Sequence, residues 1–157
     1  MASHVFHEIY LHINWHTKHD QRLLTPKIEP LVHGLLRERC RATKGVYIHE
    51  IGGTEDHVHL AINIEPFVTI SELIGELKGA SSHDANAQLR YKALEWQRGY
   101  GVVSFGKKQL EWTRQYIQNQ KQHHAAATTH DRLERTGFDE APASEDATPE
   151  GKVEKPG

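Results

Sequence analysis

Two histidines two positions apart, His57 and His59, have the residue type and the spacing to bind one metal ion. They lie within residues 56–64, where apolar side chains alternate strictly with polar or small ones. Such alternation is typical of a strand with one face on a core, so both imidazoles project from the other face. The pattern also fits, and by itself favours, a pair of solvated or hydrogen-bonded histidines on an exposed sheet face. The strand alone leaves both interpretations open.

A tyrosine and a glutamine four positions apart, Tyr116 and Gln120, belong to residues 107–127, which we predict to be a helix. Side chains at this spacing are neighbours on a helix surface. Both fall beside the packing stripe of that helix, formed by Leu110, Thr113 and Ile117. Taken by itself, a tyrosine at the margin between a helix and a sheet fits a packing residue with a hydrogen-bonded hydroxyl.

The remaining elements are predicted from the period of the apolar residues. Alternation predicts strands over residues 5–15, 46–51, 56–64 and 101–105, and apolar spacings of three and four predict helices over 25–44 and 69–89. Thr25 is a candidate N-cap with Pro26 at the first helical position, and Gly45 closes that helix. Thr69 and Glu72 have capping-box spacing at the start of the second helix.

Without the last helix, the order of these elements is βαββαβ, which predicts an α+β, ferredoxin-like fold. In this fold an antiparallel sheet carries both helices on one face. The other face, which carries His57 and His59, stays open for a substrate, for the final helix with Tyr116, or for a partner subunit.

Charge and composition divide the chain at about residue 130. Residues 131–157 hold eight acidic and four basic side chains of the 21 and 19 in the whole chain, which leaves 15 basic and 13 acidic residues, a net charge of +2, in residues 1–130. We therefore expect a domain over residues 1–130 and an acidic, disordered tail over 131–157. The sequence shows no membrane span and no secretory signal, and the single Cys40 fits a reducing cytoplasm.

The second predicted helix contains an unusually small and polar stretch, residues 78–82, which begins with Lys78 and Gly79. Small side chains beside a lysine would let a nucleic-acid backbone approach closely. Tight packing of the helix on the sheet at Gly79 and Ala80 explains the same stretch equally well.

The chain resembles the single-tyrosine HUH transposases of bacterial insertion sequences and the related REP-associated tyrosine transposases. The resemblance rests on four features that occur in the same order and at similar spacing over residues 5–124. These are the run His57-Val58-His59, the Lys78-Gly79 helix, the segment from Trp96 through Gly99-Tyr100-Gly101 to Ser104, and the run Tyr116-Ile117-Gln118-Asn119-Gln120.

The resemblance implies that His57, His59 and Gln120 bind one Mg²⁺ or Mn²⁺ ion and that Tyr116 is the nucleophile. It implies a bacterial, cytoplasmic protein that acts at the nucleoid on hairpins in single-stranded DNA and forms a homodimer. Ligand type does not settle the metal, because imidazole ligands favour softer ions such as Zn²⁺ or Ni²⁺. Lys78 is the expected DNA contact, with Lys107 and Lys108 as weaker candidates, which also fit solvated surface lysines.

Two other functions fit the same residues. One is a domesticated protein that binds hairpin DNA but no longer transposes it. The other is a metal-dependent phosphoesterase in which His57 and His59 act with water as the nucleophile. Histidine-triad hydrolases would want a third histidine where this chain has Ala61.

Overall fold

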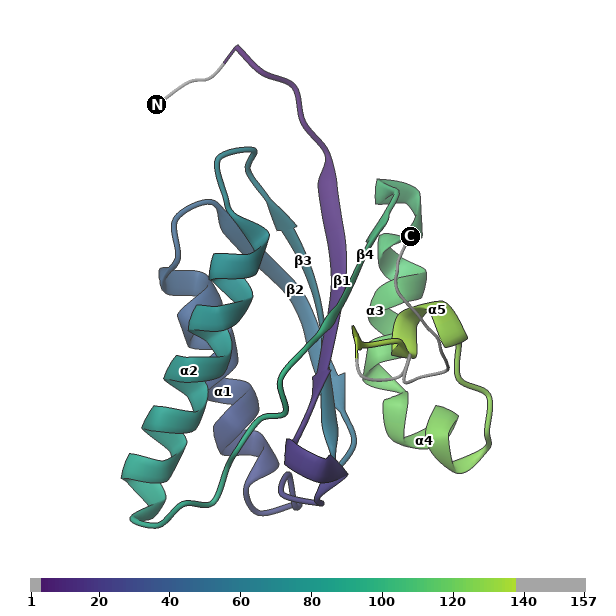
Figure 1. The fold of residues 1–157 in the computed structure, drawn as a ribbon. Helices are drawn as coiled ribbons and strands as arrows, with labels where there is room; N and C mark the ends of the chain where they lie inside the picture. Colours follow the sequence, from purple (N-terminus) through teal and green to yellow (C-terminus); the bar gives the residue numbers. More distant parts are fainter. Residues whose placement is uncertain (1–3, 138–157) are drawn as a thin grey trace, which may run out of the picture.

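A four-stranded antiparallel sheet lies at the centre of the computed structural model, which describes residues 4–137 (Figure 1). Its strands are β1 (Ile9–His16), β2 (Val46–Gly53), β3 (His57–Ile64) and β4 (Gly101–Phe105). Their order across the sheet is β2-β3-β1-β4, and every neighbouring pair is antiparallel. This is the order that the split βαβ connection produces. The predicted ferredoxin-like α+β fold is confirmed.

Helices cover both faces of the sheet (Figure 1). The long helices α1 (Glu29–Ala42) and α2 (Ile70–Leu89) lie on one face, and α3 (Leu110–Gln118), α4 (Gln120–Ala125) and α5 (Asp131–Glu134) lie on the other. A substrate, the final helix or a partner subunit was expected on this second face, and the C-terminal helices cover it.

The two faces of β1 and β3 carry different side chains, as the alternation predicts. The apolar face, which packs on α1 and α2, is formed by Ile13, Trp15, Val58, Leu60 and Ile62. The polar face, under α3–α5, is formed by His12, Asn14, His16, His57 and His59. Both faces of β3 are buried, because helices lie on each side.

Several element boundaries and one cap differ from the sequence prediction. Strand β1 begins at Ile9 rather than at residue 5. Helix α1 begins at Glu29 rather than at Pro26, because Pro30 has no N–H to donate to residue 26. Thr25 instead closes a turn, with the Ile28 N–H 3.4 Å from its hydroxyl oxygen. The capping box is not formed: Thr69 makes no side-chain cap hydrogen bond to any described residue.

In the structure, the predicted single helix over residues 107–127 is divided into three helical elements. A 3₁₀ turn (Lys107–Gln109) precedes α3. Helix α3 ends at Gln118, and the backbone angles of the following Asn119 (φ −103°, ψ 24°) lie outside the α region. Helix α4 then continues from Gln120. An asparagine side chain competes for backbone hydrogen bonds, which favours a break at such a position.

The expectation of disorder from residue 131 is wrong for the residues that the structure describes there. Helix α5 contacts β4 and β1, and Leu133 and Thr136 are buried. A mean composition over 27 residues conceals a four-residue helix with one buried apolar side chain. Residues 138–157 lie outside the described residues, so the domain limits stay predictions.

Two glycines let the C-terminal segment lie directly on the sheet. A Cβ at Gly52 of β2 would lie 2.3 Å from the carbonyl oxygen of Ile117 in α3. A Cβ at Gly101 of β4 would lie 1.8 Å from the carbonyl oxygen of Arg135, just after α5. At both places only a residue without a side chain allows this approach. Within residues 4–137, no helix has the length and apolar character needed to cross a membrane.

Candidate functional site

His57 and His59 lie side by side on the polar face and are almost wholly buried, with 2% and 0% of their surfaces exposed. Cross-strand pairing brings His16 opposite His57 and Asn14 opposite His59. The C-terminal helices provide the cover, so the interpretation as solvated histidines on an open sheet face is wrong. A buried imidazole needs partners for its nitrogens, and both residues have them.

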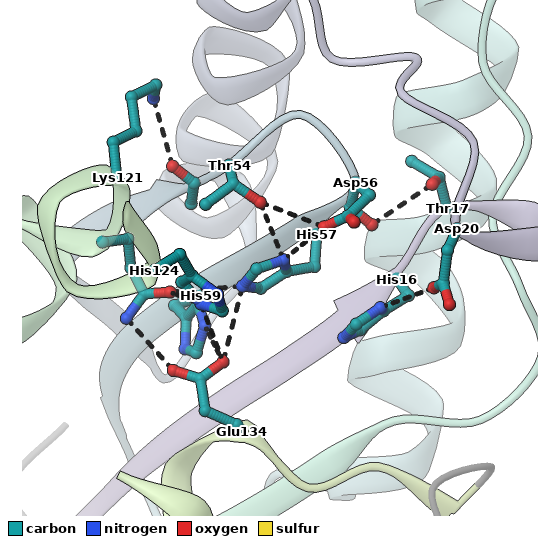
Figure 2. A network of polar contacts seen from close by, with 12 residues as sticks. His16, Thr17, Asp20, Thr54, Asp56, His57, His59, Lys121, His124 and Glu134 are labelled. Atoms are coloured by element: carbon teal, nitrogen blue, oxygen red, sulfur yellow. Dashed lines mark hydrogen bonds and ion pairs between the residues drawn. The ribbon is translucent and has the colours of Figure 1, made fainter. Parts of the chain in front are cut away.

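Hydrogen bonds to the Nδ1 atoms fix the orientation of both rings, and Figure 2 shows those of His57. The Nδ1 of His57 donates to the Asp56 carboxylate at 2.6 Å and lies 2.9 Å from the Thr54 hydroxyl. The Nδ1 of His59 shares a hydrogen bond of 2.7 Å with the Nε2 of His12. Partners on one ring nitrogen leave the other for a metal, and they hold the ring in place. Both Nε2 atoms therefore face the same small space.

Tyr116 and Gln120 reach this space from the break between α3 and α4. The Oε1 of Gln120 lies 3.2 Å from the Nε2 of His57. The hydroxyl of Tyr116 accepts the His130 N–H at 3.0 Å and donates to the carboxylate of Glu134. The ring of Trp112 stacks on Tyr116 with centroids 5.5 Å apart. All four residues singled out from the sequence meet at one site.

Two residues that the sequence analysis did not select, His124 and Glu134, complete the cluster. The Oε1 of Glu134 lies 3.2 Å from the Nε2 of His59, 3.4 Å from that of His57 and 3.3 Å from that of His124. One ligand atom from each of these four residues lies within 4.8 Å of the others. His124 follows Gln120 by four positions, a spacing that could have suggested it. Glu134 has no such signal in the sequence, because it is one of eight acidic residues in residues 131–157.

Burial and hydrogen bonding move the pKa values of these groups apart. Burial is the largest single effect on His57, but its hydrogen bonds to Asp56 and Glu134 outweigh it and raise the pKa of His57 to about 9. Burial lowers the pKa of His59 to about 4. Burial and the hydrogen bond to Glu134 raise the pKa of Tyr116 to about 12. Neighbouring ionisable groups with divergent pKa values are characteristic of functional sites.

The carboxylate of Glu134 is held in its charged form. Burial, the largest effect on it, favours the neutral acid, but hydrogen bonds from His57, His59 and Tyr116 outweigh burial and place its pKa well below the usual range. Asp56 behaves similarly: mainly because of its hydrogen bond from His57, its pKa falls to about 2.

The three lysines expected to contact DNA lie away from this cluster. Lys78 is on α2, on the opposite side of the sheet, and its Nζ donates to the carbonyls of Gln97 and Gly99 at 2.7 and 3.0 Å. The alternative prediction, tight packing of α2 on the sheet at Gly79, is wrong for that residue, because a Cβ built on Gly79 would meet no described atom of another element within 4 Å. Lys107 and Lys108 are exposed in the 3₁₀ turn before α3. Contacts of these lysines with DNA stay predictions.

A cleft of about 710 Å³ opens beside His57. The side chains that line it include His16, Arg22, Asp56, His57, Lys121 and His124. Arg22 is exposed and Lys121 is bound to the Glu29 carboxylate at 2.8 Å. The cleft therefore carries both basic and acidic side chains, Glu55 included, and borders the histidine cluster at His57 and His124.

The donor set fits a divalent metal ion. Imidazole nitrogens, an amide oxygen and a carboxylate oxygen are all common ligands of such ions. The residues that could hold one are His57, His59, Gln120, His124 and Glu134.

The fold is shared with solved transposases. A structure of a candidate transposase from Deinococcus radiodurans superposes with a TM-score of 0.61 at 21% identity, covering 76% of this chain and 96% of that one. A REP-associated tyrosine transposase bound to a REP hairpin superposes with a TM-score of 0.57 at 14% identity, covering 88% of this chain and 84% of that one.

Sequence comparison then gives the family. Residues 5–120 match the family described as "Transposase IS200 like", so the chain belongs to the IS200-like transposases. It is 30% identical over 115 residues to the transposases for insertion sequence element IS200 of Salmonella typhimurium and Salmonella typhi, covering 69% of this chain and 74% of each relative. The expected resemblance is confirmed, and family membership supports a transposase function.

Proposed function

We propose that the protein is a metal-dependent transposase that cleaves and rejoins single-stranded DNA at hairpin-marked sites through a 5′-phosphotyrosine intermediate. One observation carries the proposal: a single carboxylate, that of Glu134, contacts both the Tyr116 hydroxyl and the Nε2 of His59. The proposed nucleophile, Tyr116, and a candidate metal ligand, His59, are therefore close enough together for one carboxylate to contact both. Family membership supplies the DNA substrate class.

The chemistry is a transesterification at phosphorus. The oxygen of Tyr116, having lost its proton, bonds to the scissile phosphorus, and the bond from phosphorus to the 3′ oxygen breaks. The departing oxygen takes up a proton and leaves as a free 3′-hydroxyl, while the 5′ phosphate stays on Tyr116. A second 3′-hydroxyl later attacks this phosphotyrosine and reseals the strand, so no ATP is needed.

His57, His59 and Gln120 are the proposed ligands of Mg²⁺ or Mn²⁺. All three are neutral when they bind, so the full charge of the cation remains to stabilise the charge that develops on the phosphate. Asp56 and His12 keep the two rings oriented through their Nδ1 atoms. The sequence-derived ligand set is therefore compatible with the geometry.

Single-stranded DNA fits the surroundings of Tyr116. The ring of Trp112 is 46% exposed and lies parallel to that of Tyr116, where it can stack on an unpaired base. Arg22 and Lys121 in the cleft can contact phosphates, and we retain Lys78, Lys107 and Lys108 as proposed contacts. The REP-associated relative binds a hairpin, which favours the same class of substrate here. A homodimer and action at the nucleoid also stay proposals.

The proposal is tested by trapping the covalent adduct. Single-stranded hairpin oligonucleotides from the flanks of the gene are incubated with protein and Mn²⁺ or Mg²⁺ and resolved on a denaturing gel. We expect an adduct that disappears with EDTA and with Tyr116→Phe. The matched control is Tyr47→Phe, because Tyr47 also donates to a carboxylate, that of Glu65, and lies on the exposed part of β2.

Other outcomes identify the alternatives. An adduct that survives Tyr116→Phe would show that another group is the nucleophile. Hairpin binding without any adduct would favour a domesticated DNA-binding protein. Hydrolysis of nucleotides that is unaffected by Tyr116→Phe would favour the phosphoesterase, although position 61 holds a buried alanine rather than a third histidine.

A further inference from the structure

Glu134 is bound at both of its oxygens within the proposed site. Its Oε1 lies 3.2–3.4 Å from the Nε2 atoms of His57, His59 and His124. Its Oε2 accepts hydrogen bonds from the Tyr116 hydroxyl and, at 3.2 Å, from the Nε2 of Gln120. The family match ends at residue 120, so His124 and Glu134 both lie beyond it.

We propose that His124 and Glu134 join His57 and His59 as ligands of a divalent metal ion in the DNA-free protein, and that Glu134 holds the place of the scissile phosphate. This inference rests on the proposed function for the identity of the site and deepens it. It assigns a second ligand set, of three imidazoles and one carboxylate, to a site whose sequence-derived set is two imidazoles and an amide.

The spacing of the donor atoms is compatible with this ligand set, since all four lie within 4.8 Å of one another. A tetrahedral shell with metal–ligand distances of about 2.1 Å places its donors roughly 3.4 Å apart. The separations from the Glu134 oxygen to the three imidazole nitrogens, 3.2, 3.3 and 3.4 Å, are close to that value. Three imidazoles with one carboxylate favour Zn²⁺ or Co²⁺ over Mg²⁺, which prefers six oxygen ligands.

The position of the carboxylate is also that of a phosphate in the proposed reaction. Cleavage requires one phosphate oxygen beside the histidines and the phosphorus beside the hydroxyl of Tyr116. The Oε1 of Glu134 lies beside the Nε2 of His59, at the place of that phosphate oxygen, and its Oε2 lies beside the Tyr116 hydroxyl, on the side of the phosphorus. Tyr116 is only 2% exposed and His59 is fully buried, so DNA reaches them only after the covering segment, residues 130–137, has moved.

The covering segment is held to the histidines through Glu134, to the Tyr116 hydroxyl through the His130 N–H, and to strands β1 and β4. Leu133 and Thr136 are buried, and the guanidinium of Arg132 donates to the Ser104 carbonyl at 2.7 Å. The segment also depends on Gly101, because a Cβ there would collide with the Arg135 carbonyl. The segment contributes no strand to the sheet, so its displacement leaves the strand pairing intact.

The first test measures metal binding in the absence of DNA. The full chain is titrated with Co²⁺, and its visible absorption is recorded for the wild type, for Glu134→Gln and for Asp131→Asn. Asp131 is the matched control, because it belongs to the same helix but is exposed and pairs only with Arg135 among the described contacts. We expect Glu134→Gln to weaken Co²⁺ binding by about tenfold or more and to change the four-coordinate spectrum. Asp131→Asn should alter neither.

A second pair of variants separates ligand loss from misfolding. His124→Gln removes another proposed ligand, one that lies on α4 rather than on α5, and should weaken Co²⁺ binding similarly. Gly101→Ala changes no proposed ligand residue but pushes the covering segment, and Glu134 with it, away from the histidines, so it should reproduce the effect of Glu134→Gln. Wild-type Co²⁺ affinity and spectrum in Glu134→Gln, with the variant folded by circular dichroism, would overturn the proposal.

The last measurement asks whether the carboxylate and the DNA compete. With Mn²⁺, Glu134→Gln and Gly101→Ala should bind hairpin DNA several-fold more tightly than the wild type and should give at least as much covalent adduct. Hairpin affinity equal to or lower than that of the wild type in both variants would exclude Glu134 as a substitute for the phosphate. If no variant forms an adduct while the Co²⁺ results hold, the proposed function fails and the metal site stands.

Discussion

The two faces of one sheet are filled in opposite ways. The apolar face and the helices α1 and α2 form a continuous hydrophobic core, whereas the polar face buries histidines, an asparagine and a glutamine under α3–α5, beside the partly buried carboxylate of Glu134. Burial of apolar surface stabilises the fold, while burial of polar groups costs free energy unless each group is paired. We infer that the apolar face stabilises the fold, and that this stability offsets the free-energy cost of burying polar groups on the face that carries the candidate site.

Neighbouring residues on β3 allow the sharpest test of this contrast. Leu60 points to the apolar face and is fully buried, so Leu60→Ala should lower the free energy of unfolding by about 3 kcal/mol. His59 points to the polar face, so His59→Ala should abolish the adduct and most metal binding with a smaller loss of stability. Urea denaturation and the trapping assay, run on both variants, measure the two effects.

The contrast would be broken if His59→Ala lost more stability than Leu60→Ala, or if Leu60→Ala lost the adduct at a temperature where it is folded. Asn63→Ala serves as the control for the polar side of β3. Asn63 bonds to His49 at 2.6 Å rather than to the histidine cluster, so this variant should retain the adduct.

A second prediction concerns the backbone contact between β2 and α3. Gly52→Ala places a Cβ 2.3 Å from the Ile117 carbonyl, so it should cost about 1–3 kcal/mol of stability and reduce adduct yield by displacing Tyr116. Gly34→Ala is the matched control in α1, where the new Cβ meets no described atom within 4 Å. It should stabilise by about 0.5–1 kcal/mol. Equal melting temperatures for the two variants would show that α3 does not depend on the close approach.

The smallest expected effect concerns Asp56, which orients His57. Asp56→Asn keeps an acceptor oxygen but removes its charge, so Co²⁺ affinity should fall by about tenfold with little change in stability. Asp20→Asn is the control, because Asp20 bonds in the same way to His16, at 2.7 Å, but is exposed at the rim. If both substitutions weaken metal binding equally, general electrostatics rather than orientation of His57 would explain the loss.

Local sequence determined the fold and the two faces. Strict alternation over residues 56–64 predicted both the strand and the face of each histidine, since the side-chain period of a strand is two. The βαββαβ order predicted the sheet topology, because a helix between two strands carries the chain across the sheet. The spacing of four between Tyr116 and Gln120 correctly put them near each other, but the helix itself breaks at Asn119 between them.

The rest of the site depends on contacts between segments far apart in the chain. His12 and Glu134 reach His59 from positions 47 before and 75 after it, and neither distance in sequence leaves a local pattern. The acidic composition after residue 131 even pointed away from Glu134, because average composition cannot show which carboxylate finds a positively charged partner. The sequence by itself determined the sheet, its two faces and the paired histidines. Only the tertiary structure decided what covers those histidines, because burial and pairing of polar groups arise when distant segments meet.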